Sequence, residues 1–138
     1  MNFRETFEWL MRDRHLDSRI RRLKIRRMEL MSCLEPGSMR YDQDRVQTSP
    51  KDTVATIFAE VDVLDREIET LQEQRAAAVI EVSDAIEQME DEREKTVLAM
   101  FFLERRRMEE IAEELHYNRQ HAYKVRRRGI ENLGRKIS

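Results

Sequence analysis

Cysteine, proline and glycine are scarce in this sequence, which has one, two and three of them respectively in 138 residues. The single cysteine, Cys33, allows neither an intramolecular disulfide nor a thiolate metal cluster, so we expect a reducing, cytoplasmic setting. The scarcity of glycine and proline, together with 39 % charged residues, is typical of long solvent-exposed helices. We therefore expect an all-α protein.

Long hydrophobic runs are also absent. The longest, residues 97–103, falls far short of the ~20 residues that a membrane helix needs, so we expect no membrane partner. Residues 1–7 carry acid and base where a signal peptide would carry an apolar stretch.

Features of enzymes are missing as well. The sequence has no glycine-rich phosphate loop, no nucleophile elbow and no carboxylate pair on an apolar background. His15, His116 and His121 lack the spacing of metal ligands. We expect no enzymatic activity, no cofactor and no metal site.

Charge is plentiful but unevenly distributed. The net charge is −2, yet residues 51–95 carry 14 acidic and 5 basic side chains, whereas residues 115–138 have a net charge of +6. Because a local basic field attracts polyanions whatever the total charge, the C-terminal segment is the candidate for nucleic-acid binding.

The N-terminal segment predicts one amphipathic helix from residue 3 to about residue 34, followed by a linker at about 35–49 that opens with Pro36 and Gly37. Residues 12–27 hold eight basic and two acidic side chains. Their basic character has two readings: a second nucleic-acid or polymerase site, or pairing with the acidic segment, which we favour because it needs no new ligand.

A second, longer helix is predicted over residues 50–90, with Pro50 at its first position. Eleven positions follow an unbroken 3-4 spacing, the pattern of a coiled-coil seam interrupted only by Arg75. Its apolar members include Val54, Ile57, Val61, Leu64, Ile68, Leu71 and Val82, then Ala85 and Met89. The N-terminal helix in a hairpin, a second copy of the chain, or both together would cover this seam. We expect residues 1–92 to be an oligomerisation region, with a dimer favoured.

Three shorter amphipathic helices are predicted at residues 93–103, 107–115 and 119 to about 133. The first is expected to place Val97, Leu98, Phe101 and Phe102 on one face. Together these helices predict a trihelical domain over residues 93–138.

The last two helices fit a helix-turn-helix, whose second helix lies in the major groove of DNA. Ala112 falls where the two helices cross, and Asn118 is placed as the N-cap of the second helix. His116 stands where the turn usually has glycine, but histidine is among the residues that best tolerate a left-handed backbone.

The stretch "MEEIAEELHYNRQHAYKVRRRGIENL" resembles the helix-turn-helix of sigma factor region four. Over about residues 44–138 the chain is also similar to phage and prophage transcriptional regulators of the RinA/ArpU kind. The resemblance implies a phage-encoded regulator that binds double-stranded DNA at a promoter or operator in a bacterial host cell. It also implies base-reading side chains, listed in chain order as Arg119, Gln120, His121, Tyr123 and Lys124.

Other arginines are candidate phosphate contacts, which fix register without reading sequence. They are Arg126, Arg127 and Arg128 in the recognition helix, and Arg105 and Arg107 before the helix-turn-helix. Solvated helix faces would explain the same arginines.

Two alternative functions remain open from the sequence. A DNA-packaging protein of the small-terminase type also joins a helix-turn-helix to an oligomerising coiled coil. The other is a sigma-like module that docks on RNA polymerase and does not touch DNA, which exposed apolar residues on the 93–103 helix would favour.

Overall fold

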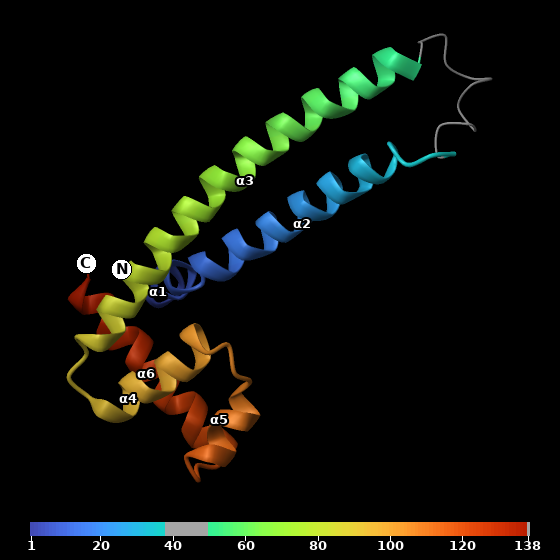
Figure 1. Cartoon of the computed structure of the whole chain (residues 1–138). Coiled ribbons are helices and arrows are strands. Elements are labelled where there is room, and N and C mark those ends of the chain that lie inside the picture. Colours follow the sequence, from blue (N-terminus) through green and yellow to red (C-terminus); the bar gives the residue numbers. More distant parts are fainter. Residues whose placement is uncertain (38–49, 138) are drawn as a thin grey trace. The chain divides into compact units, whose positions relative to one another are not determined.

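The computed structural model describes residues 1–37 and 50–137, where every regular element is a helix (Figure 1). The predicted all-α class is confirmed for these residues. Most of the predicted linker, residues 38–49, lies outside them. The elements are α1 (Phe3–Leu10), α2 (Arg12–Ser32), α3 (Pro50–Glu87), α4 (Glu92–Leu98), the π-helical segment η2 (Ala99–Leu103), α5 (Met108–Glu114) and α6 (Arg119–Lys136).

The described chain forms two compact units. Residues 15–74 make a hairpin unit, and residues 1–14 together with 75–137 make a C-terminal unit. The predicted boundary at residue 92 therefore differs from the observed one, because both the first turns of the chain and the end of α3 pack with the C-terminal helices.

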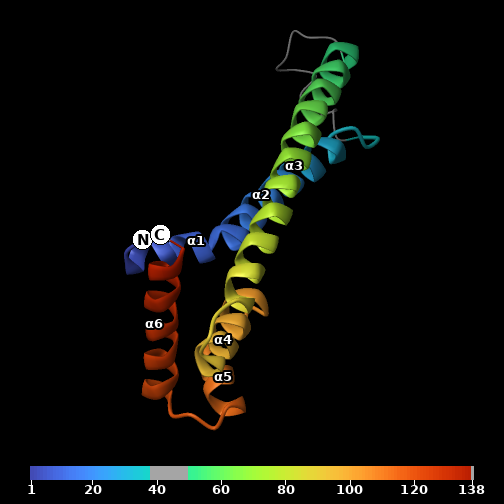
Figure 2. The same ribbon diagram turned by 90° about the vertical axis from the view of Figure 1, so that its left-hand side faces the viewer.

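In the hairpin unit, α2 and α3 run antiparallel and side by side (Figures 1 and 2). Ile20 of α2 is buried against Ile68 and Leu71 of α3. Ion pairs flank this core, with Arg19 Nη2 2.8 Å from Glu67 Oε1 and Arg27 Nε 2.6 Å from Asp65 Oδ1. The predicted pairing of the basic N-terminal helix with the acidic helix is confirmed. No described contact tests the alternative covering by a second copy.

The predicted seam is largely buried. The buried members are Ile57, Val61, Leu64, Ile68, Leu71, Ala78, Val82 and Met89, and Val54 is half-buried. The register departs from the prediction near the end of α3, where Ile86 is buried in place of the smaller Ala85. Arg75, the one polar member of the seam, pairs with Asp13, and its Nε lies 2.7 Å from Asp13 Oδ1.

The prediction of one helix from residue 3 to about residue 34 is wrong at Met11. There the backbone leaves the regular helix, with φ −86° and ψ −3°, and α2 begins at Arg12. Leu10 is fully buried in the core of the C-terminal unit, and the polar side chain of Thr6 is also buried. Because of this interruption, α1 packs as a separate element. Its partners are core residues of the C-terminal unit that lie far from α1 along the chain.

The C-terminal unit has two adjoining hydrophobic clusters, which contact different sides of α4 and η2. Leu98 and Phe102 join Leu10, Ile86 and other residues, whereas Val97 and Met100 join the core of the helix-turn-helix. The predicted single apolar face of residues 93–103 is thus wrong. Adjacent residues on a helix point about 100° apart, so one short element serves both clusters.

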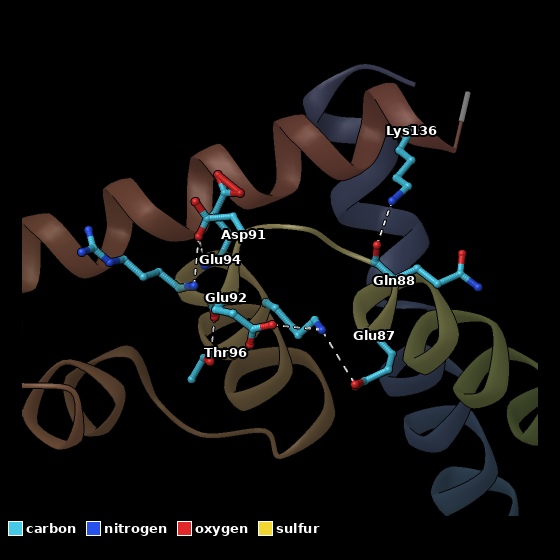
Figure 3. A network of polar contacts seen from close by, with 9 residues as sticks. Glu87, Gln88, Asp91, Glu92, Glu94, Thr96 and Lys136 are labelled. Carbon is cyan, nitrogen blue, oxygen red and sulfur yellow. Dashed lines mark hydrogen bonds and ion pairs between the residues drawn. The ribbon is translucent and has the colours of Figure 1, made fainter.

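The turn between α3 and α4 is held by side-chain contacts (Figure 3). Asp91 caps α4, its carboxylate accepting hydrogen bonds from the backbone N–H groups of Arg93 and Glu94. Lys136 of α6 donates to the carbonyl of Gln88 at 2.7 Å. These contacts anchor the C-terminal end of α6 beside the end of α3.

Candidate nucleic-acid interface

The helix-turn-helix is built from α5, a tight turn and α6. His116 has φ +59°, the left-handed conformation that the sequence predicted for the turn. The N–H of Tyr117 donates to the carbonyl of Ala112 at 2.8 Å, which satisfies one of the last carbonyls of α5. The turn therefore ends α5 abruptly and directs the chain into α6.

Asn118 begins α6 as predicted. Its side-chain oxygen accepts a hydrogen bond from the N–H of His121 at 2.8 Å. Behind the cap, Ile111, Ala122 and Val125 are buried, and Ala112 is small enough for the close approach of the two helices. One face of α6 is fixed in the core, and the opposite face is presented outward.

The five predicted base-reading residues lie at the N-terminal end of α6. Arg119, Gln120 and Lys124 are exposed, while His121 and Tyr123 are half-buried. All of them except Arg119 line one shallow surface depression, which Asn118 and Arg127 complete.

Neighbouring side chains orient two of these residues. The ring of His121 packs edge-on against Tyr117, with ring centroids 4.6 Å apart. Arg119 Nη2 lies 3.7 Å from Glu109 Oε1 of α5, although the Arg119 side chain is 71 % exposed. A pair this exposed contributes little stability but does limit where the guanidinium points.

Three of the predicted phosphate contacts are accessible. Arg127 and Arg128 are exposed on α6. Arg107, at the start of α5, is also exposed, and its hydrogen bond to Glu110 raises the pKa of its guanidinium. Arg127 Nε lies 3.3 Å from Oε1 of Glu131, one turn further along α6. These weak surface pairs leave the cations available to a stronger anion such as phosphate.

Two other predicted phosphate contacts are engaged within the protein. Arg105, with φ +57°, places Nη2 3.0 Å from Asp13 Oδ2. Arg126 is half-buried among aromatic rings rather than extended into water. We therefore leave both out of the proposed phosphate contacts. The sequence did not show this, because Asp13 and Phe101 lie far along the chain from Arg105 and Arg126, respectively.

Sequence reasoning missed the contribution of α1, which lies against α6 (Figure 2). Gly134 marks the close approach: a Cβ there would lie 2.3 Å from Thr6 Oγ1. Gly129 marks a similar approach of α6 to α4, with a Cβ 3.2 Å from Leu98. Two glycines inside a helix are the local signal that neighbouring elements pack closely there.

A buried carboxylate was also missed. Glu94 of α4 is 6 % exposed and accepts hydrogen bonds from Asn132 Nδ2 at 2.7 and 3.1 Å. Burial is the main cause that raises its pKa, and the nearby charge of Asp91 adds to the effect. The pair joins α4 to α6 through a polar contact at the edge of a surface depression that Asp91 and Lys136 also line.

The sequence predicted neither a metal site nor a membrane-spanning helix. Within the described residues, no group of three or more histidine, cysteine, aspartate or glutamate side chains is arranged to hold a metal ion. Among the same residues, no helix is long and apolar enough to cross a membrane.

Comparison with known proteins identifies a family. The model of a protein family described as "Protein of unknown function (DUF1492)" matches residues 36–134. No curated protein and no solved structure matches the chain. The matched region contains α3 to α5 and nearly all of α6, whereas α1 and α2 precede it.

Proposed function

The chain belongs to the DUF1492 family, and we propose that it is a sequence-specific regulator of transcription that binds double-stranded DNA. In this proposal α6 enters the major groove. The observation that carries it is the geometry at residues 116–118. A left-handed turn and an N-cap present Arg119, Gln120 and Lys124 together at the exposed start of a helix whose other face is buried.

The chemistry of these side chains suits base edges. Arginine pairs bidentately with guanine and glutamine with adenine, so Arg119 and Gln120 would read adjacent positions. Arg127, Arg128 and Arg107 would contact phosphates and fix the register of α6 in the groove. Sigma factors usually have glutamate and arginine at the positions of Gln120 and His121, so the preferred sequence would differ from the usual promoter element.

We assign the protein to the RinA/ArpU kind of phage or prophage regulator, acting as a dimer in a bacterial cell. The hairpin unit supports association of copies, because it exposes the large apolar side chains of Ile25, Met28, Phe58 and Val63. Two joined copies would hold two recognition helices at a fixed spacing and favour a two-fold symmetric site.

The test is selection from a pool of random duplexes at about 0.15 M salt, with the whole protein. Enrichment of a symmetric motif is expected. Gln120→Ala should then relax the preference at one base pair by about 1–3 kcal/mol. Arg127→Ala should weaken binding to selected and random duplexes alike. Recovery of no motif, or equal losses on both duplexes for both variants, would contradict base reading by α6.

The two alternatives have separate outcomes. A small-terminase-like protein would assemble into rings of eight or more copies, which light scattering would detect. Apolar residues exposed on the helix at 93–103 would favour a polymerase-docking module. Of the large apolar side chains there, all described, only Leu103 is exposed, and only to 36 %, so this alternative gains no support.

A further inference from the structure

Arg126 occupies an aromatic cage in the C-terminal unit. The carbon at the centre of its guanidinium lies 4.8 Å from the ring centroid of Tyr123, 4.8 Å from that of Phe101 and 5.8 Å from that of Phe7. The three rings come from α6, η2 and α1, respectively. Arg126 Nε is buried and has no hydrogen-bond acceptor.

The surroundings of Arg126 explain how the cation is held. Attraction between a cation and the faces of aromatic rings strengthens when water is excluded. Burial lowers the pKa of Arg126, but a guanidinium remains protonated at neutral pH. The charge is therefore retained and directed at rings, which leaves it poorly placed for a phosphate.

Neighbouring contacts prevent the rings from shifting. Phe102 packs edge-on against both Phe7 and Phe101, with ring centroids 5.6 and 4.9 Å apart. Arg14 also packs on Phe101: the central carbon of its guanidinium lies 4.8 Å from the ring centroid, and it donates a hydrogen bond to the carbonyl of Phe101. The cage is thus built on a packed base of aromatic residues.

The third wall of the cage faces the proposed DNA-reading surface. Tyr123 lines the same depression as Gln120 and Lys124. Its ring also carries the guanidinium of Arg119, whose central carbon is 5.8 Å from the ring centroid. The orientation of the Tyr123 ring therefore sets where the Tyr123 hydroxyl lies and also where the Arg119 guanidinium packs.

We propose that Arg126 is a positioning residue that fixes the Tyr123 ring, and through it Arg119, for base reading, and that Phe7 of α1 completes this support. The inference rests on the proposed function and deepens it. It assigns a role in DNA discrimination to an N-terminal helix that precedes the region matched by the family. It also gives Arg126 a different role from that of its neighbour Arg127, whose side chain is 74 % exposed.

The experiment compares Arg126→Met with the matched control Arg127→Met. Dissociation constants are measured for the selected duplex and a random duplex over a range of salt concentrations. Arg126→Met should lose about tenfold in discrimination, with affinity for random DNA and the salt slope unchanged. Arg127→Met should weaken both duplexes equally and reduce the salt slope by about 0.9. If Arg126→Met behaves like Arg127→Met, or leaves both constants unchanged, the positioning role is wrong.

A double-mutant cycle distinguishes positioning from general stability. In a Tyr123→Ala background, Arg126→Met should cause no further loss of discrimination, because it acts through the missing ring. Arg126→Lys should restore part of the discrimination, and Phe7→Leu should reduce it. If Arg126→Met does not fold, these last two variants provide the test. Additive losses, or full discrimination in Phe7→Leu, would overturn the proposal.

A measurement without DNA tests the cage independently of the proposed function. In NMR spectra of the free wild-type chain, the side-chain protons of Arg126 should be shifted upfield by the surrounding rings, and Phe7→Leu should reduce that shift. Unshifted protons would refute the cage itself. A shifted signal in a protein that selects no DNA sequence would instead refute the proposed function, and with it the role in base reading.

Discussion

At the scale of the residue, Glu94 is a carboxylate that folding removes from water. Its folded pKa is raised by burial and by Asp91, although Asn132, Arg128 and Arg135 oppose the rise. The folded chain therefore holds the proton to higher pH than the unfolded chain does. Stability falls as the pH rises from the ordinary glutamate pKa through the raised one, and it stays lower above that.

Glu94→Gln should remove this dependence. The amide oxygen still accepts a hydrogen bond from Asn132, while no charge has to be desolvated. We expect a higher free energy of unfolding at pH 7 than in the wild type and a flatter profile between pH 4 and 7, measured by urea denaturation. Glu90→Gln, a change at an exposed site beside α4, is the control and should leave the profile unchanged. A loss of stability at pH 7 in Glu94→Gln would contradict the assignment.

At the scale of the element, the turn between α5 and α6 depends on one left-handed residue. A residue with a side chain pays up to about 1–2 kcal/mol for that conformation, and glycine does not, although glycine also loses more entropy on folding. His116→Gly should therefore stabilise the protein slightly, by up to about 1 kcal/mol. His116→Val should destabilise it by a similar amount, because a β-branched residue is poorly suited to positive φ.

Urea denaturation followed by far-UV circular dichroism would measure both changes. A glycine variant less stable than the wild type would mean that the contacts of the His116 side chain outweigh the backbone effect.

The turn also shows which parts of the site were predictable from sequence. His116 and Asn118 act on their own backbone or that of residues within a few positions, so the order of residues along the chain was enough to place them. The environment of Arg126 was not predictable in this way. Its cage uses Phe7 and Phe101, which the helical periodicity assigns to separate elements without saying which of them meet. The break at Met11 has the same origin, since the buried position of Leu10 belongs to a distant core.

At the scale of the whole molecule, the C-terminal unit is discontinuous in sequence. Leu10, Val82 and Ile86 are core residues of that unit although they precede residue 93. A fragment of residues 93–138, the domain that the sequence predicted, would lack these partners and expose Leu98, Phe102 and the buried face of α6. Exposing several large apolar side chains costs about 1.5–3 kcal/mol for each.

We therefore expect the 93–138 fragment not to unfold cooperatively on heating, whereas the full chain does. Circular dichroism and calorimetry of both would decide. A sharp, reversible transition in the fragment would show that its own helix-turn-helix core, which includes Ile111 and Val125, is sufficient for folding.

The contact between α1 and α6 also has a consequence for the order of folding during synthesis. The ribosome releases α1 before α6, and Phe7 reaches Arg126 only after more than a hundred intervening residues have been made. The hairpin of α2 and α3 relies on pairs much closer together along the chain, so it is free to form earlier. A nascent chain would thus present a finished hairpin before the C-terminal unit can complete its core.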